Sequence, residues 1–304
     1  MMRKFVWLLF FLGIAITIAI IFNEGITKIY YDTVKYFSPI DTTLNKNEYY
    51  REYDFDYVQN TVDFEPKDID DIRNIFYTII NSGQETFSFY CPDEYVTCTD
   101  DVKRLANDQE ELSHINNFVH PYNGFKHIET QYNSLGKVTV TVFKNYDKEM
   151  IRTIDAKVDE VIANNLTATS TDVDKIKMAH DYIINNARYD TDRSQRNVIS
   201  YKSDIAYGPL IQGFAICGGY SDAMQLFLEK FGLKNYRVAS DGHIWNAVNV
   251  NGKWYHLDLT WDDPITNDGT QIVDDKYFLI STYKLHSLDT TEHIFNQNIY
   301  SEVN

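Results

Sequence analysis

Two alternating segments joined by Asn251-Gly252 constrain the fold more than any other part of this sequence. The segments read HIWNAVNV (243–250) and KWYHLDLT (253–260). Asparagine followed by glycine between alternating strands is a strong signal for a two-residue β-hairpin, because both turn positions need a positive φ. Since the residues that flank such a turn pair with each other, the turn also fixes the register. We therefore expect an antiparallel sheet here.

The register predicts which side chains share a face of that sheet. Counting back from the turn, Trp245 faces Asp258 and His243 faces Thr260. His243 and Asp258 are then diagonal neighbours, roughly 7 Å apart at the backbone, which an imidazole and a carboxylate can bridge. His256 lies on the same face and is a rival for the role of base. The alternative is a core histidine beside a solvated acid.

A helix is expected before the hairpin, over residues 218–231. Apolar residues recur there at helical spacing, and Gly232 follows as a stop. Cys217 lies at the mouth of this helix, where unpaired N–H groups and the helix dipole favour a thiolate. Gly218 and Gly219 are expected to leave room beside the sulfur for a substrate backbone. A buried structural cysteine is the alternative for Cys217 taken alone.

Together these residues resemble the transglutaminase-like superfamily, relatives of papain with a Cys-His-Asp triad. The matching motifs are AICGGYSDA around Cys217, HIWNAVNVNGKWYHLD around His243 and Asp258, and TWDDP at 260–264. Upstream, DKIKMAHDYIINNARYD and AYGPLIQG resemble the family's lead-in helix and the loop before the cysteine. Downstream, DDKYFLIS resembles its closing strand. The resemblance covers about residues 170–285.

This resemblance implies an α+β fold with a papain-like core, in which a helix bearing the cysteine packs on an antiparallel sheet bearing the histidine and the aspartate. It implies that Cys217 is the nucleophile, His243 the general base and acid, and Asp258 the carboxylate that orients the histidine. The backbone N–H of Cys217 is one oxyanion donor by geometry. Tyr207 and Gln212 are candidates for the second, since transglutaminases use an aromatic donor and the papain branch a glutamine. A plain loop or packing role is the alternative for both.

Charge and composition exclude several classes of function. The 304 residues carry a net charge of −16, which would repel a nucleic-acid backbone and disfavours charge-driven docking on anionic lipid. We expect no cofactor and no metal. The acidic pairs Asp262-Asp263 and Asp274-Asp275 do not have the spacing of an EF-hand loop and are interpreted as solvated loop charges.

The N-terminal sequence predicts a membrane anchor. Residues 5–22 are apolar and uncharged over a length near the lower limit for a membrane-spanning helix. Arg3 and Lys4 precede them, which puts the N-terminus in the cytoplasm and the rest of the chain outside the cell. No small-residue cleavage site follows, so an uncleaved signal-anchor is favoured over a cleaved signal peptide.

Four regions follow from these patterns. Residues 1–24 form the signal-anchor, 25–60 a polar and acidic stalk, 61–150 an α+β module, and 151–304 the catalytic domain. The module contains no chemical motif, and the sequence leaves open whether it folds alone or completes the catalytic sheet.

Local signals predict the elements of the module. They are a helix between Pro66 and Gly83, a strand at ETFSFYC, a helix over 99–120 capped by Thr99, and a hairpin joined by Ser134-Leu135-Gly136. A helix over 148–165 leads into the catalytic domain.

The two remaining cysteines lie close together in the module. Outside the cell, Cys91 and Cys98 could close a small disulfide loop, which would leave Cys217 as the odd free thiol. Two free cysteines are the alternative.

The sequence thus predicts a membrane-anchored extracellular thiol enzyme that transfers acyl groups from protein or peptide amides through a Cys217 acyl-enzyme. An amine acceptor would make it a crosslinking transglutaminase, and water a cysteine protease or amidase. Cell-envelope protein or peptide is the expected substrate, and the lipid bilayer the expected partner of the N-terminal helix. The alternative from a different class is a non-catalytic cell-surface binding or scaffold protein with the same fold.

Overall fold

The computed structural model describes residues 12–14, 16–17, 29, 33, 36, 42–264, 272–288 and 291–303. Most of the predicted membrane segment at 5–22 lies outside these residues. Within the described part of the chain, no helix has the length and hydrophobicity that a bilayer span needs.

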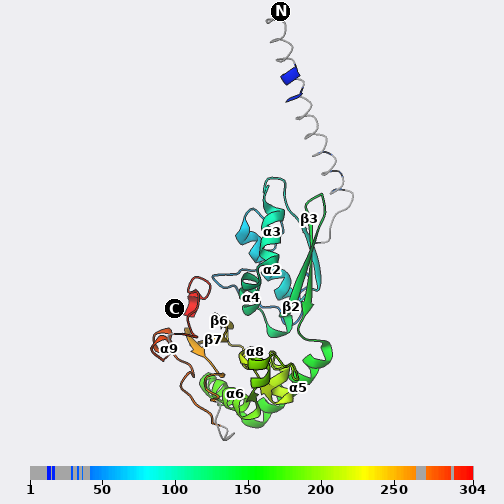
Figure 1. Cartoon of the computed structure of the whole chain (residues 1–304). Helices are drawn as coiled ribbons and strands as arrows, with labels where there is room; N and C mark the ends of the chain where they lie inside the picture. The colour runs from blue at the N-terminus through cyan, green and yellow to red at the C-terminus, as the bar shows by residue number, and fades with distance from the viewer. Residues whose placement is uncertain are drawn as a thin grey trace, which may run out of the picture.

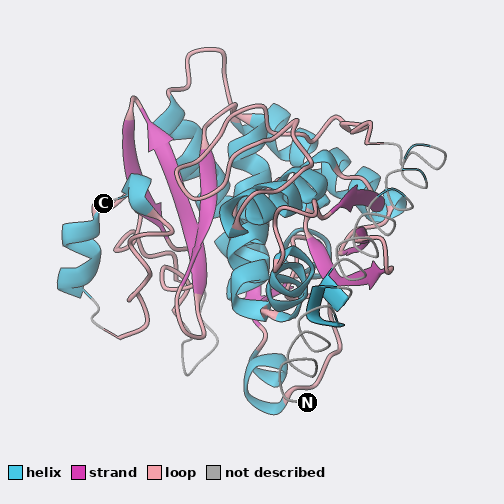
Figure 2. Ribbon diagram, turned by 90° about the horizontal axis from the view of Figure 1, so that it is seen from above, coloured by secondary structure: helices cyan, strands magenta, loops and turns pink. Residues whose placement is uncertain are grey.

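The chain is α+β, with two separate three-stranded antiparallel sheets. The first has the order β1-β3-β2 and the second the order β6-β7-β8. Figure 1 shows α2, α3 and α4 beside the first sheet and α5, α6 and α8 grouped in the other half. Seen from above in Figure 2, helices fill the middle of the view and strands lie to either side of them. The strands are β1 (Thr86–Tyr90), β2 (Phe125–Tyr132), β3 (Lys137–Lys144), β4 (Arg188–Tyr189), β5 (Phe214–Ala215), β6 (Asn235–Ala239), β7 (Ile244–Val250) and β8 (Lys253–Leu257).

Side-chain caps define several of the helix ends. In α2 the carboxylate of Asp68 accepts from the N–H of Asp71, and Gly83 ends the helix at a φ of 73°. Both termini obey the rules that placed a helix between Pro66 and Gly83. The helices are α2 (Ile69–Ser82), α3 (Cys98–Asn107), α4 (Gln109–Asn117), α5 (Lys148–Asn165), α6 (Asp172–Asn186), α7 (Thr191–Arg196), α8 (Cys217–Lys230) and α9 (Thr282–Leu288), with a π-helix at Gly208–Gln212 and short 3-10 turns at Pro121–Asn123 and Ser301–Val303.

The single helix predicted over 99–120 is wrong, because two helices fill that region. Asp108 adopts an extended conformation between them, and its side chain accepts from the N–H of Glu111. An aspartate that caps a helix in this way ends one helix and begins the next. Thr99, the expected cap, lies inside α3, whose N-cap position is Thr97.

The module and the second sheet share one hydrophobic core. Its buried residues include members of α2, α4 and the first sheet together with residues of β6, β7 and the C-terminal segment. Phe118 contacts both Tyr236 and Tyr300, with ring centroids 5.0 Å and 5.6 Å apart. The module therefore has its own sheet and does not extend the second one, but it is packed against that sheet.

Residues 42–60, expected to be part of the stalk, belong to the folded body. Arg51 is only 2% exposed and pairs with Glu229 of α8 at 2.5 Å. Phe55 is also buried in the shared core. The polar and acidic composition of this segment concealed its few buried side chains.

The expected closing strand at DDKYFLIS is also absent as a regular strand. The segment turns over residues 276–279 and touches the sheet through one bridge, in which His256 and Ile280 exchange backbone hydrogen bonds of 2.8 Å and 3.0 Å.

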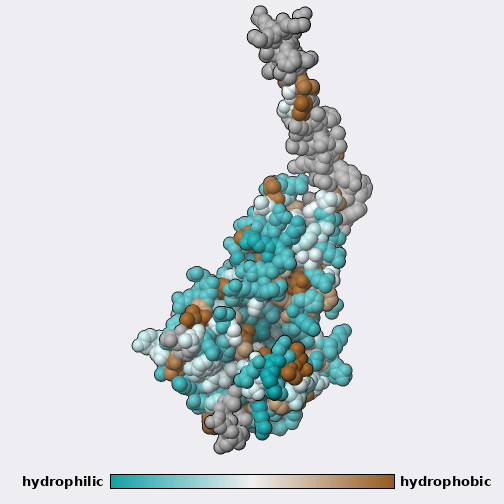
Figure 3. Space-filling view, in the orientation of Figure 1, coloured by the Kyte–Doolittle hydropathy of each residue, from teal (hydrophilic) through white to brown (hydrophobic). Residues whose placement is uncertain are grey.

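The face of the molecule seen in Figure 3 is mostly hydrophilic, and its hydrophobic residues are scattered.

Candidate functional site

The β7–β8 hairpin positions a histidine and an aspartate at its open end. Val250 pairs with Lys253 across the turn, and both Asn251 and Gly252 have positive φ. The ladder ends earlier than the sequence predicts, at the pair of Asn246 with Leu257. His243 therefore lies just before β7 and Asp258 just after β8.

Asp258 ends the strand because its own side chain organises the next turn. Its Oδ1 accepts the backbone N–H groups of Thr260 at 2.9 Å and Trp261 at 3.3 Å. This local hydrogen bonding competes with strand pairing and fixes the orientation of the carboxylate. The other oxygen, Oδ2, is left to face His243.

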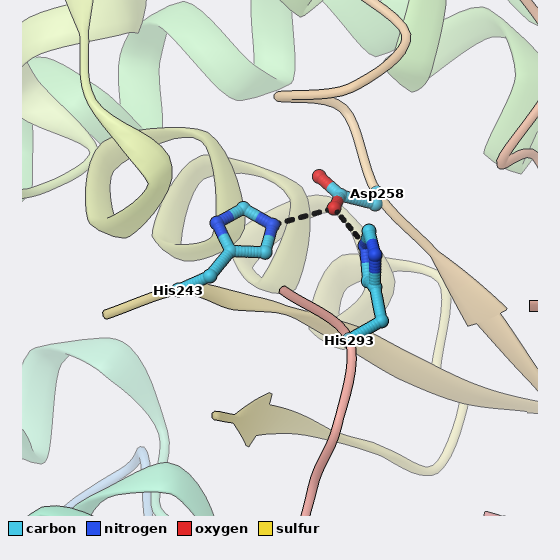
Figure 4. Close-up of side chains that lie close together, drawn as sticks. All are labelled: His243, Asp258 and His293. Atoms are coloured by element: carbon cyan, nitrogen blue, oxygen red, sulfur yellow. Dashed lines mark hydrogen bonds and ion pairs between the residues drawn. The ribbon is translucent and has the colours of Figure 1, made fainter. Parts of the chain in front are cut away.

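The structure brings His243 and Asp258 into direct contact. Nε2 of His243 lies 2.6 Å from Oδ2 of Asp258, and both side chains are buried, at 7% and 1% exposure (Figure 4). Since Nε2 is held by the carboxylate, Nδ1 is the ring nitrogen left to meet another group. The diagonal neighbours that the hairpin register predicted are thus side-chain neighbours.

Cys217 is the first residue of α8 and a free, half-buried thiol. Cys91 and Cys98 form a disulfide, so the alternative of two free cysteines is wrong. The first-turn N–H groups of α8 have no partner within the helix, which leaves partial positive charge beside the sulfur. The charge of Cys217 also acts on His243, so the thiol lies near the imidazole.

The charges of these groups depend on one another. Burial lowers the pKa of His243, but the charge of Asp258, its hydrogen bond to His243 and the effect of the nearby Cys217 outweigh burial and raise that pKa to about 10. Burial also disfavours the charged form of Asp258. The charge of His243 and its hydrogen bond nevertheless hold the pKa of Asp258 well below its usual range. The pair is therefore an imidazolium and a carboxylate over a wide range of pH.

The glycines after Cys217 serve packing instead of opening space for a substrate. A Cβ on Gly218 would lie 2.8 Å from the backbone oxygen of Asp204, and one on Gly219 would collide with the backbone oxygen of Ser203. Only glycine lets the start of α8 approach this loop so closely. The expectation that they leave room for a substrate backbone is wrong on this side of the helix.

The two candidate oxyanion donors lie in the loop that precedes the cysteine. Gln212 ends the π-helix, and its Oε1 accepts the backbone N–H of Lys202 at 2.8 Å. Tyr207 is half-buried against the core around α6 and α8. Among the described residues, neither side chain forms a hydrogen bond with Cys217 or His243, and Gln212 holds the backbone of Lys202.

Tyr189 is a neighbour of the thiol that the sequence did not single out. It pairs in parallel with Ala215, two residues before Cys217. Burial raises the pKa of Tyr189, a hydrogen bond with Ser194 opposes this, and the charge of Cys217 adds to it. Tyr189 is part of the lead-in motif, but a two-residue strand has no periodicity that would mark it.

His256, the rival base, is committed elsewhere. Its Nδ1 accepts from Nε1 of Trp245 at 3.0 Å, and its Nε2 lies 3.1 Å from Oγ1 of Thr282. Burial and the charges of His293 and His286 lower the pKa of His256 to about 3. It is a neutral core histidine that holds the hairpin to α9.

A second histidine binds Asp258, and sequence reasoning missed it. Nε2 of His293 lies 2.8 Å from the same Oδ2 that contacts His243 (Figure 4). His293 is fully buried and stacks on Tyr277 at 5.2 Å between ring centroids. It comes from the irregular segment 291–300, which has no repeating pattern that would place it at the hairpin.

His243, Asp258 and His293 offer ligand atoms that all lie within 4.8 Å of one another. These are atom types that bind zinc, but ligands about 2.1 Å from a tetrahedral zinc lie roughly 3.4 Å apart. The distances of 2.6 Å and 2.8 Å from Asp258 to the two histidine nitrogens are hydrogen-bond distances. The arrangement fits hydrogen bonding better than coordination.

The acidic pair Asp262-Asp263 is not solvated, so that interpretation is wrong. Asp262 is fully buried, and its carboxylate lies 3.1 Å from Nε2 of His180 and accepts the N–H of Tyr277 at 2.9 Å. Asp263 accepts from the hydroxyl of Tyr220. Both carboxylates fasten the loop after the hairpin to α6 and α8. A second group of ligand atoms, from His180, Asp181 and Asp275, lies at the edge of the same loop.

Comparison with solved structures returned limited similarity. One is described as a TGase, with 19% sequence identity, a TM-score of 0.33 and 45% of each chain covered, so the chain spans less than half of that protein. Another is described as a putative cysteine protease from Cytophaga hutchinsonii, with 12% identity, a TM-score of 0.28, and 51% of this chain and 69% of that chain covered. No family model and no curated protein matches the sequence. The two structures are of the kinds that the motifs resemble, but overlaps this small carry no argument about activity.

Proposed function

We propose that the chain is a thiol enzyme that transfers acyl groups from protein or peptide amides. The observation that carries this proposal is the contact of His243 with Asp258 at 2.6 Å, with the free thiol of Cys217 near enough for its charge to act on the imidazole. Three residue types in this order supply a nucleophile, a proton carrier and an orienting charge.

In the proposed reaction each step involves a named atom. The Cys217 thiolate attacks the amide carbonyl carbon, and the carbonyl electron pair moves to oxygen. When the C–N bond breaks, the proton on Nδ1 of His243 passes to the leaving amine and a thioester remains. An amine or a water then attacks the thioester carbon, its proton returns to Nδ1, and the thiolate leaves.

The developing oxyanion needs donors on the side of the thiol. The backbone N–H of Cys217 is one, because it lies at the start of α8. The hydroxyl of Tyr189 is the proposed second donor, because the strand that contains Tyr189 runs beside the residues that lead to Cys217. Gln212 stays a candidate, because the N–H of Lys202 occupies only its Oε1, and Nε2 is the atom that would donate to an oxyanion.

A location at the outer surface of a membrane is also proposed. It is supported by the uncharged stretch at residues 5–22, by the basic residues before it, and by the Cys91–Cys98 disulfide, which suits an oxidising compartment. Proteins or peptides of the cell envelope are the proposed substrates on the basis of this location.

Incubating the purified protein with a glutamine-containing protein and a labelled primary amine tests the reaction. Mass spectrometry separates the outcomes: incorporation of the amine indicates a transferase, backbone cleavage a protease, and deamidation an amidase. Cys217→Ala is the matched control. If neither protein yields product, and iodoacetamide labels Cys217 no faster than a model thiol, the enzyme proposal is wrong and a binding or scaffold role is favoured.

A further inference from the structure

Asp258 is saturated with hydrogen-bond donors. Its Oδ1 accepts two backbone N–H groups, and its Oδ2 lies 2.6 Å from His243 and 2.8 Å from His293. An orienting carboxylate needs one histidine to perform its task. The second histidine therefore requires its own explanation.

The surroundings of His293 exclude direct chemistry on a substrate. The residue is fully buried, and its ring is enclosed by Trp245, Trp261 and Tyr277, with centroids 4.9 Å, 5.1 Å and 5.2 Å away. Figure 4 shows the rings of His243 and His293 both directed at the same oxygen of Asp258. His293 can therefore act on the proposed chemistry through the carboxylate of Asp258, which it contacts.

We propose that His293 is a positioning residue for the proposed thiol chemistry: its Nε2–H holds Oδ2 of Asp258 in place and limits how tightly that carboxylate retains the proton of His243. The inference rests on the proposed function, because it concerns the same carboxylate.

The electrostatic reason is the direction of the N–H dipole. The donor of His293 presents its positive end to the same oxygen that His243 contacts, and the two rings lie 5.3 Å apart at an angle of 86°. A positive dipole end at this distance opposes the positive charge of a protonated His243. His243 must give up its proton to a leaving amine, so a carboxylate shared by two donors suits proton transfer better than one that binds a single imidazolium.

Other titratable groups lie near this pair, among them the buried Asp262, which feels the charge of Asp258. Tyr277 stacks on His293, the charge of Cys217 acts on His243, and the charges of His293 and His286 act on His256. Since the pKa of His256 is about 3, it does not change its charge in the neutral to alkaline range in which His243 loses its proton.

Two substitutions separate the donor from the shape of the ring. His293→Phe keeps an aromatic ring among its aromatic neighbours but removes the N–H. His293→Gln keeps a neutral N–H donor that reaches as far as Nε2. His180→Phe is the matched control, because His180 is equally buried and bonded to a different buried carboxylate, that of Asp262.

The readout is the rate of Cys217 alkylation by iodoacetamide as a function of pH, which needs no substrate. In His293→Phe the alkaline step of this profile, at which His243 loses its proton, should move up by about half a unit to one unit. His293→Gln should stay near wild type, and His180→Phe should lose thermal stability without moving the profile. A His293→Phe profile that coincides with wild type or moves down overturns the proposal, as does His293→Gln behaving like His293→Phe.

These outcomes are distinct from failure of the proposed function. If wild-type Cys217 reacts like an ordinary thiol, the enzyme proposal and this inference are both wrong. If wild type shows a pH-dependent, accelerated reaction and His293→Phe shares its profile, only the role of His293 is wrong. Circular dichroism of each variant confirms that a folded protein was measured.

Discussion

Oδ2 of Asp258 lies 2.6 Å from Nε2 of His243, although the two residues stand outside the hydrogen-bonded ladder of the hairpin that connects them. The contact arises because the Asn251-Gly252 turn fixes the register while the turn after Asp258 holds its carboxylate. It gives the site a buried ion pair at the open end of a rigid element. The consequences of this arrangement can be measured one residue at a time.

Cys217→Ala should abolish activity and leave the fold intact. The thiol is half-buried at the first position of α8, and alanine is tolerated there without a large cavity. We expect a loss of at least about 10³-fold in turnover, since no other nucleophile replaces the thiolate. The activity assay and a thermal melt check both halves of the prediction. Retained turnover in this variant would remove the thiol mechanism.

The two histidines of the hairpin should respond differently to substitution. His243→Ala should reduce turnover nearly as much as Cys217→Ala, because it removes the proton carrier. His256→Ala should mainly destabilise, by about 1–3 kcal/mol, because it leaves the buried Nε1 of Trp245 without an acceptor. Turnover per folded molecule, with the folded fraction taken from denaturant titration, separates the two effects. The opposite order of damage would assign the role of base to His256.

Much of this site could be predicted from the sequence because its main elements are local. A two-residue turn and a helical apolar repeat are readable from neighbouring residues, and they placed Cys217, His243 and Asp258. Tyr189 and His293 were missed because they lie in a two-residue strand and an irregular segment, whose positions depend on tertiary packing. The burial of Arg51 was not predicted for the same reason, because its ion pair with Glu229 joins segments far apart in the chain.

The disulfide between Cys91 and Cys98 should stabilise the module without taking part in the chemistry. The loop that it closes is short, at a sequence separation of 7, so the chain-entropy model predicts a contribution of about 2–3 kcal/mol. The double variant Cys91→Ser with Cys98→Ser should therefore melt at a lower temperature. Its alkylation of Cys217 should match wild type at temperatures where both proteins are folded. Loss of Cys217 reactivity in the folded double variant would show that the disulfide affects the site as well as the stability of the module.

Asp258→Asn tests whether the carboxylate orients and charges His243. The amide keeps the shape but cannot accept from both histidines as an anion does. In a serine-protease triad the equivalent change lowers turnover by about 10⁴. A thiol ionises more readily than a hydroxyl, so the loss here should be smaller, on the order of 10 to 10³.

The pH dependence of stability also tests whether Asp258 sets the charge of His243. The pKa of His243 is raised from 6.5 to about 10 in the folded chain, chiefly by Asp258 acting against burial. A raised pKa contributes stability that is fully present below pH 6.5 and is lost as the pH rises through about 10. Wild type should therefore lose stability between these values, and Asp258→Asn should lose less, because its His243 is already neutral at lower pH. Denaturant midpoints at pH 6 and pH 10 measure the difference. Equal losses in the two proteins would show that Asp258 does not set the charge of His243.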